Sequence, residues 1–202
     1  MTKKERIKIN KKHIKNGVII IDPENTYIDE SVEIGKNTVI YPNTYITGKV
    51  VIGERCQIRA SYISDSIIGN DNTIGPYAHI RNNSIIGSNN RIGNFVEIKN
   101  TKIKDHTSAA HHAYLGDAEI GSNVTIGCGT ITVNFDGKEK HKTIIEDECF
   151  IGCNVNLIAP ITIKKGSLVA AGSTITVDVP EESLAIARER ETIKEGYMKN
   201  KK

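Results

Sequence analysis

Aliphatic residues, most of them isoleucine, recur every six positions along most of this chain. The period runs from Ile28 to Ile58, resumes from Ile68 to Ile98 and returns from Ile145 to Ile175. A six-residue period matches neither the 3.6-residue turn of an α-helix nor the two-residue alternation of a hairpin sheet. It predicts a parallel β-helix, in which one aliphatic residue per hexad points inward and stacks on its equivalents in the neighbouring coils.

Glycine follows many of these aliphatic residues directly, as in Ile34-Gly35 and Ile92-Gly93. Glycine at the corner of a coil tolerates unusual φ and ψ angles. The composition agrees, because 34 isoleucines against 4 leucines favour the pleated surface of strands. An ordinary β-sandwich, the alternative all-β fold, would not hold a six-residue register over this length.

The length and composition also indicate which classes of protein this chain can belong to. The chain has 202 residues, of which 38% are hydrophobic, enough for one sizeable core. Its longest aliphatic run, Val18–Ile21, is far shorter than the roughly 20 residues that span a bilayer. The N-terminus lacks the apolar segment of a signal peptide. We therefore expect a soluble, cytoplasmic protein with no membrane partner.

Four cysteines are present, Cys56, Cys128, Cys149 and Cys153, and none of them forms a C-x-x-C pair. The chain is not a short secreted sequence either. We therefore interpret all four as small buried thiols and expect neither a disulfide framework nor a metal site.

The first 17 residues differ in charge from the rest. Residues 1–17 hold seven Lys or Arg against Glu5 alone, whereas the remainder is slightly acidic. Thr2 and Glu5 have the spacing of a capping box, and Gly17 is placed as a helix stop. The segment predicts a basic helical arm with a helix over 3–15. Because aromatic residues that could stack on bases are few, we interpret it as a solvated helix face and not as a nucleic-acid site.

Three parts follow from this pattern. Residues 1–17 form the arm, residues 18–180 form the β-helix, and residues 181–202 form a tail. We expect the tail to cap the open end of the solenoid, because an uncapped last coil exposes a strand edge.

Two segments interrupt the hexad register. Residues 99–119 include His106, His111 and His112, and residues 132–144 are polar with a turn signal at Asp136-Gly137. Insertions leave a solenoid as loops, and loops on a rigid scaffold usually carry the binding groups. We therefore look for function there.

Several longer motifs add a specific resemblance. They are IGPYAHIR (74–81), IGNFVEIKN (92–100), HHAYLGDAEIG (111–121), TITVNFDG (130–137), KTIIEDECFIG (142–152), AIAR (185–188) and KEGY (194–197). In this order they resemble the C-terminal acetyltransferase domain of the bifunctional glucosamine-1-phosphate acetyltransferase/N-acetylglucosamine-1-phosphate uridyltransferase, a hexapeptide-repeat transferase family. The resemblance covers about residues 13–198.

The resemblance implies an all-β, left-handed parallel β-helix that assembles as a homotrimer with active sites between neighbouring subunits. It also implies the reaction. An acetyl group moves from acetyl-CoA to the 2-amino group of glucosamine-1-phosphate, which yields N-acetylglucosamine-1-phosphate for UDP-N-acetylglucosamine synthesis.

The implied reaction needs a base that titrates near neutrality, because an ammonium cannot attack a thioester. His111, in the H-x-x-Y motif, is similar to the family's catalytic base. His112 competes for this role, since the family more often has an apolar residue there. Glu97 is expected to orient the imidazole and to stabilise its cation.

The sugar phosphate carries negative charge and calls for several cations. Arg81, Lys99 and Lys140 match the family's substrate-binding positions, and Tyr114 matches a hydroxyl donor to the sugar. Thr125 stands where the family usually has asparagine, so that one sugar contact is altered.

The resemblance also assigns the acetyl-CoA contacts, and no step requires a metal. The implied residues are Cys128, Asn134, Phe135, Cys153, Ala171 and Arg188. The backbone N–H of Cys128 is a candidate donor to the thioester oxygen, and Arg188 would pair with a phosphate of CoA. Alanine and serine are common at positions 128 and 153, and a thiol is a weaker hydrogen-bond partner than a hydroxyl.

Three questions stay open at this stage. Nothing in residues 1–27 matches the family's nucleotidyltransferase domain, so the chain is either a stand-alone acetyltransferase or the C-terminal part of a longer enzyme. The acceptor could be another amino sugar or a UDP-amino sugar. A non-catalytic solenoid that docks a separate uridyltransferase through the helix over 3–15 is the alternative without enzyme activity.

Overall fold

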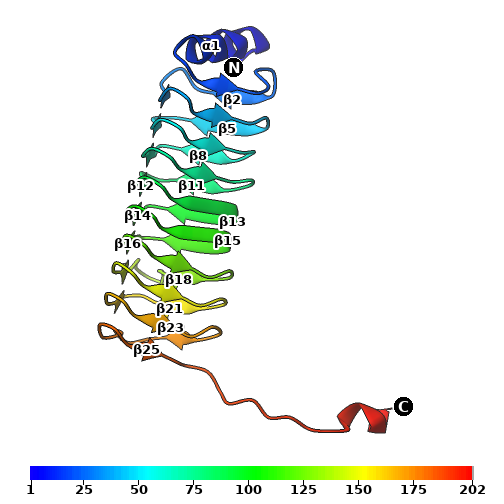
Figure 1. Ribbon diagram of the computed structural model, residues 1–202, viewed down its shortest axis with the longest axis vertical. Coiled ribbons are helices and arrows are strands. Elements are labelled where there is room, and N and C mark those ends of the chain that lie inside the picture. The colour runs from blue at the N-terminus through cyan, green and yellow to red at the C-terminus, as the bar shows by residue number, and fades with distance from the viewer. Residues whose placement is uncertain (202) are drawn as a thin grey trace.

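The computed structural model describes residues 1–201 as a tall prism of stacked coils (Figure 1). Helix α1 (Lys3–Lys15) lies across the N-terminal end, and the C-terminal segment leaves the opposite end. Within residues 1–201 every pairing between strands is parallel, and each strand away from the ends of the prism pairs with strands one coil before and one coil after it. The expected left-handed parallel β-helix is confirmed.

The strands form three faces. Eight strands form one face: β3 (Glu33–Ile34), β6 (Val51–Ile52), β9 (Ile67–Ile68), β12 (Ile85–Ile86), β14 (Lys102–Ile103), β16 (Ala118–Ile120), β19 (Thr143–Ile145) and β22 (Ile161–Ile163). The other two faces comprise β1 (Ile19–Ile20), β2 (Thr26–Ile28), β4 (Val39–Ile40), β5 (Thr44–Thr47), β7 (Gln57–Ile58), β8 (Tyr62–Ser64), β10 (Thr73–Ile74), β11 (His79–Arg81), β13 (Arg91–Lys99), β15 (Ser108–Gly116), β17 (Thr125–Ile126), β18 (Ile131–Val133), β20 (Phe150–Ile151), β21 (Asn156–Ile158), β23 (Leu168–Val169), β24 (Thr174–Ile175) and β25 (Leu184–Ala185).

Two strands run continuously around one corner of the prism. β13 pairs with β10 before the corner and with β11 after it, and β15 pairs in the same way with β17 and β18. The strands turn at Phe95 and His112, whose φ angles are 57° and 38°. Both are left-handed conformations that non-glycine residues seldom adopt, and they recur at other corners of the prism, as at Tyr77 and Asn154.

The core is the stack of inward-pointing aliphatic residues that the hexad period predicts. Ile74 pairs with Ile92, and Ile92 with Ala109, in consecutive coils, and all three are fully buried. Each coil therefore shares its apolar contacts with its neighbours, and stability accumulates along the axis.

Helix α1 has the predicted bounds and covers the N-terminal end of the core. The Thr2 hydroxyl accepts from the Glu5 backbone N–H, and the Glu5 carboxylate accepts from Thr2, which completes the capping box. The buried Asn10 side chain donates to the carbonyl oxygens of Pro23 and Thr26, 2.9 Å away in each case. These bonds attach the helix to the first coil.

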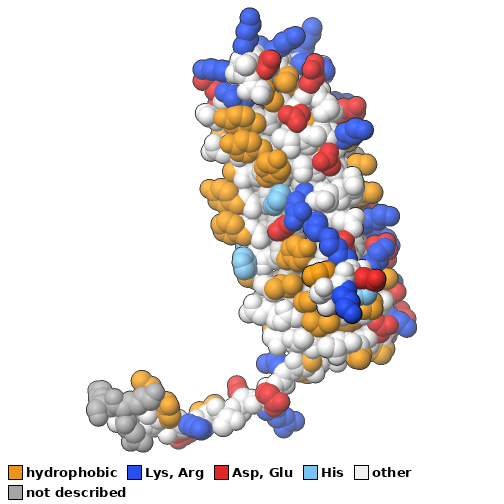
Figure 2. Space-filling view, turned by 180° about the vertical axis from the view of Figure 1, so that it is seen from behind, with side chains coloured by type: hydrophobic (Ala, Val, Ile, Leu, Met, Phe, Trp, Pro, Cys, Tyr) orange, Lys and Arg blue, Asp and Glu red, His pale blue; other side chains and the backbone are white. Residues whose placement is uncertain are grey.

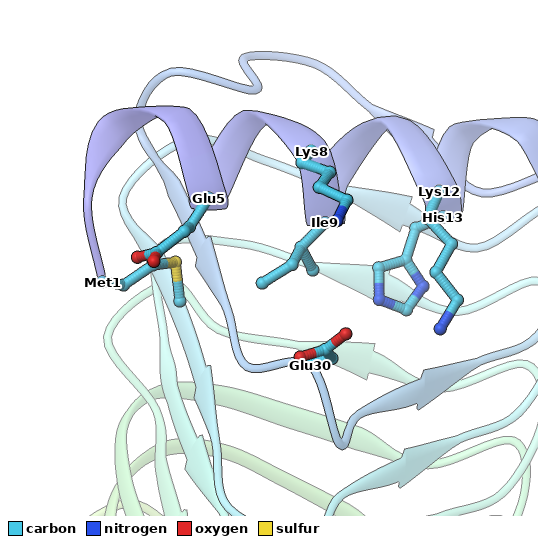
Figure 3. Close-up of a pocket in the computed structure, with 7 residues that line it drawn as sticks. All are labelled: Met1, Glu5, Lys8, Ile9, Lys12, His13 and Glu30. Carbon is cyan, nitrogen blue, oxygen red and sulfur yellow. The ribbon is translucent and has the colours of Figure 1, made fainter.

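A cavity of about 290 Å³ lies between α1 and the coil beneath it. Figure 3 shows Ile9 and His13 reaching from the helix toward Glu30 on that coil. His13 is buried, and this burial, aided by the neighbouring Lys12 charge, lowers the pKa of the imidazole below its ordinary value of 6.5. The folded arm therefore favours neutral His13.

The tail pairs with the solenoid over only part of its predicted length. β25 pairs with β23, and the Ala187 N–H donates to the Ser173 hydroxyl at 3.1 Å. Beyond this point the chain leaves the prism and ends in a short 3₁₀ helix, η1 (Tyr197–Lys201) (Figure 1). The segment that follows is highly charged, with Arg188 to Glu191 all exposed, and offers little apolar surface to cover the last coil.

The prediction that all four cysteines are buried is correct for two and wrong for two. Cys56 and Cys149 are buried, and burial raises the pKa of both thiols. Cys128 and Cys153 are exposed because they lie at corner turns, where side chains point outward. Among the described residues, no helix has both the length and the apolar character needed to cross a bilayer.

Candidate functional site

The predicted base and three predicted cofactor residues lie at equivalent positions of one corner. We call this set the corner column: Asn94, His111, Cys128, Cys153 and Ala171. Each member directly precedes a residue with positive φ, and those residues are Phe95, His112, Gly129, Asn154 and Gly172. Asn94 pairs with His111 in register, and the registers on either side of the corner place Cys128 beneath His111 and Cys153 beneath Cys128.

The imidazole of His111 is held by Asn94. Nδ1 of His111 lies 2.8 Å from Oδ1 of Asn94. An amide oxygen can only accept a hydrogen bond, so Nδ1 carries the proton and the lone pair of the neutral ring lies on Nε2. His111 is exposed, which leaves Nε2 accessible to a bound molecule.

Asn94 was missed by the sequence reasoning, which assigned the orienting role to Glu97. Within the described residues of the chain, the Glu97 carboxylate forms no hydrogen bond or ion pair with His111. It accepts from Nε of Arg81 at 2.9 Å and from a second guanidinium nitrogen at 2.5 Å. The signal that could have identified Asn94 is its position in the hexad, which is the same as that of His111 one coil later.

The predicted substrate cations lie on the face that follows this corner. Arg81 pairs with Lys99 in register, and Lys99 with Gly116. Lys140 reaches the same place from the inserted segment. Its proximity to Lys99 lowers the pKa of the Lys140 ammonium, because two like charges face each other. Three cationic side chains therefore converge. Among the described residues, Arg81 is the one of the three whose charge is neutralised by a carboxylate in an ion pair.

Tyr114 directs its hydroxyl toward these cations. The residue pairs in register with Glu97, and its hydroxyl oxygen lies 2.5 Å from the place where a Cβ atom on Gly116 would be. Any side chain at position 116 would displace the ring. Glycine is therefore required at 116 for the Tyr114 hydroxyl to hold this direction.

The inserted segment is a short hairpin that presents Lys140. Phe135 and Lys140 form an antiparallel bridge, and the Asp136 carboxylate accepts from the backbone N–H groups of Lys138 and Glu139. The same carboxylate lies 2.7 Å from Nε2 of His141. These hydrogen bonds, led by that from Glu139, lower the pKa of Asp136, so the carboxylate stays charged and keeps the turn closed.

The predicted cofactor-binding residues and Thr125 do not all lie together within one chain. Cys128, Cys153 and Ala171 belong to the corner column, and the Arg188 side chain passes 3.8 Å from the Cβ position of Gly172 at its lower end. Asn134 and Phe135 lie on the hairpin, where the Asn134 amide donates to Asp117. Thr125 is exposed on β17, the face that precedes the corner. The chain alone does not bring Thr125 or the hairpin residues to the column.

A shallow groove of about 240 Å³ lies beside the corner. Its lining residues are Phe95, Glu97, His112, Ala113, Tyr114, Gly129 and Ile131. Phe95 stacks on Tyr77 with ring centroids 5.5 Å apart, and both side chains are more than half exposed. Figure 2 shows hydrophobic side chains gathered along one side of the prism, with histidine and a run of basic side chains nearby.

Comparison with curated proteins identifies close relatives. The chain is 56% identical over 210 residues to the bifunctional protein GlmU of Geobacillus sp. and 53% identical over 214 residues to that of Bacillus subtilis. These alignments cover 96% and 98% of this chain but only 46% of each relative. The chain thus spans about half the length of the curated relatives it matches.

A family profile and solved structures agree on the architecture. The profile described as GMPPB C-terminal domain matches residues 22–106. The fold is similar to that of UDP-N-acetylglucosamine acyltransferases from Francisella novicida (22% identity, TM-score 0.76, 84% of this chain and 67% of that one) and Bacteroides fragilis (26%, 0.70, 84% and 71%). A third similar structure is PerB from Caulobacter crescentus in complex with CoA and GDP-perosamine (22%, 0.53, 58% and 54%).

Proposed function

Because this chain is homologous over nearly all its length to about half of the bifunctional GlmU proteins, we propose that it transfers acetyl from acetyl-CoA to the 2-amino group of glucosamine-1-phosphate. The product is N-acetylglucosamine-1-phosphate, a precursor for UDP-N-acetylglucosamine synthesis. Residues 1–202 are assigned only this acyltransfer and no uridyltransfer.

The arrangement of His111 carries the proposal. With Nδ1 donating to Asn94, Nε2 is free to take the proton that the sugar amine loses as it attacks the thioester carbonyl. The same nitrogen then returns the proton to the CoA sulfur as the carbon–sulfur bond breaks. The backbone N–H of Cys128, one coil below, is the proposed donor to the oxyanion.

The cations supply the phosphate subsite. Lys99 and Lys140 repel each other in the free chain, as the lowered pKa of Lys140 indicates. A phosphate dianion between them would relieve this repulsion and accept hydrogen bonds from both ammonium groups. Arg81 adds a guanidinium at the same end, and the Tyr114 hydroxyl is positioned to reach the sugar.

A homotrimer completes the site in this proposal. Thr125, the corner column and the hairpin lie on different sides of one prism, so residues of neighbouring chains must meet for all of them to contact one substrate pair. The exposed side chains of Tyr45, Tyr62, Tyr77 and Phe95 support such packing, since contiguous apolar surface of this kind usually meets a partner.

A second acceptor class is favoured by one residue. Thr125 replaces the asparagine usual in the family, and a different sugar substituent would then face a hydroxyl in place of an amide. This favours another amino sugar or a UDP-amino sugar as the acceptor.

Release of the CoA thiol in the presence of glucosamine-1-phosphate tests the proposal. We expect turnover with this acceptor and at least tenfold less with UDP-amino sugars, because the cation cluster accommodates a terminal phosphate. Preference for a UDP-amino sugar would select the second acceptor class. Absence of acetyl-CoA binding in calorimetry would instead favour a non-catalytic solenoid that docks another subunit through α1.

A further inference from the structure

The two exposed cysteines are neighbours on consecutive coils. Their strands pair through Ile126 and Ile151, and the Asn154 N–H donates to the Cys128 carbonyl oxygen at 2.7 Å. This register sets Cys153 directly beneath Cys128. Stacked coils are about 4.8 Å apart, within the roughly 4.4–6.8 Å that separates the Cα atoms of disulfide-linked cysteines.

The backbones approach closely at this point. Glycine precedes each cysteine, and a Cβ atom on Gly127 would lie 2.5 Å from the Cys153 nitrogen. Both cysteines occupy the same place in their corner turns, just before Gly129 and Asn154 with φ angles of 77° and 54°. Equivalent backbone conformations project the two side chains from the prism in the same direction.

Side chains in this column do reach one another. The preceding pair, Asn94 and His111, has the same relationship, and their side chains meet at 2.8 Å. The thiols of Cys128 and Cys153 are accessible, and among the described residues neither forms a hydrogen bond. In contrast, the buried thiols of Cys56 and Cys149 approach carbonyl oxygens at 3.2 and 3.1 Å.

We propose that Cys128 and Cys153 form a vicinal dithiol that small-molecule disulfides oxidise reversibly to an intrachain disulfide at the proposed acetyl-CoA contacts of the corner column. One thiolate attacks the small disulfide and releases one thiol. The second thiolate attacks the resulting mixed disulfide, forms the Cys128–Cys153 bond and releases the second thiol. The two cysteines lose two electrons and two protons, and the small disulfide gains them.

The effect on acetyl transfer rests on the proposed function, whereas the chemistry of the dithiol does not. A disulfide at this place would occupy the column directly below His111, where the thioester is proposed to lie. Oxidation should therefore block turnover, and dithiothreitol should restore it.

The first experiment treats the wild-type protein with oxidised glutathione and maps its cysteines by mass spectrometry. We expect a single intrachain link between the Cys128 and Cys153 peptides, while Cys56 and Cys149 stay reduced as internal controls. Separate glutathione adducts on the two residues, a link between chains or no reaction would each overturn the proposal. In the Cys128→Ser and Cys153→Ser variants, oxidation should stop at a mixed disulfide between glutathione and the remaining cysteine. If either variant fails to fold, the cysteine map of the wild-type protein alone tests the proposal.

The second experiment adds acetyl-CoA before the oxidant. At a hundred times its dissociation constant, acetyl-CoA should slow disulfide formation by about 100-fold if the bound form is fully protected. An unchanged rate with acetyl-CoA bound would show that the dithiol lies outside the acetyl-CoA site. If the chain has no acetyltransferase activity, the first experiment still decides whether the dithiol exists.

Discussion

Asn94 and His111 face each other across adjacent coils, with 2.8 Å between Oδ1 of the amide and Nδ1 of the imidazole. The bond fixes both the tautomer and the direction of the ring. Asn94→Ala should lower kcat and leave the KM for both substrates nearly unchanged. The loss should be smaller than the ~10²–10⁴-fold that removal of the base itself brings.

The Asn94→Asp variant tests this prediction through the pH dependence of kcat, which would not change if Asn94 had only a structural role. A carboxylate beside Nδ1 stabilises the imidazolium, so the acid limb of the kcat–pH profile should move to higher pH. An unshifted profile in a folded variant would show that Asn94 does not orient the base.

The two adjacent histidines can be separated by substitution. His111→Ala should lower kcat by ~10²–10⁴-fold with an unchanged thermal midpoint, because the side chain is exposed. His112→Ala, the matched control one residue away, should retain most of the activity. If a thiol-release assay instead shows that His112→Ala loses activity and His111→Ala retains it, the base is His112.

Lys140→Met should weaken phosphate binding without loosening the hairpin, because the turn is closed by Asp136 and not by the lysine ammonium. The KM for glucosamine-1-phosphate should rise, and inorganic phosphate should stabilise the variant less than the wild type in thermal unfolding. Lys138→Met, on the same hairpin but outside the proposed cluster, is the control. Equal stabilisation of the Lys140 variant and the wild type would place the phosphate elsewhere.

Ile92→Ala tests the nearest-neighbour character of the core. Ile92 is fully buried between Ile74 and Ala109, and truncation should cost ~2–5 kcal/mol of unfolding free energy through the cavity it leaves. Denaturant unfolding measures the loss. A cost below about 1 kcal/mol would mean that the coils relax into the space.

The attachment of α1 should weaken in mild acid. Burial lowers the pKa of His13 in the folded state, so folding is favoured in full above the ordinary value of 6.5, and this stability is lost as the pH falls from that value through the lower pKa of the folded state. Helix content followed by circular dichroism should therefore fall between about pH 7 and pH 5. His13→Gln should remove this pH dependence. If the variant still loses helix content in acid as the wild type does, the titrating group is Glu5 or Glu30 and not His13.

The hexad period was sufficient to predict a parallel β-helix, because burial in a solenoid depends on one repeating position, whereas its left hand was implied only by the resemblance. Ile92 could be placed in the core from its spacing alone. Contacts between coils were harder to predict, since they depend on which residues share a corner. For this reason Glu97 was assigned to His111 although it pairs with Arg81, and the exposure of Cys128 and Cys153 was missed.

The hairpin that carries Lys140 enters between two strands without disturbing the ladder on either side. Thr132 still pairs with Leu157, and Ile120 with Ile145. Apart from Asn134, which is buried and bonded to Asp117, its length and sequence can therefore change at little cost to the scaffold. Replacing this single segment offers a route to enzymes with altered acceptor preference on an unchanged frame.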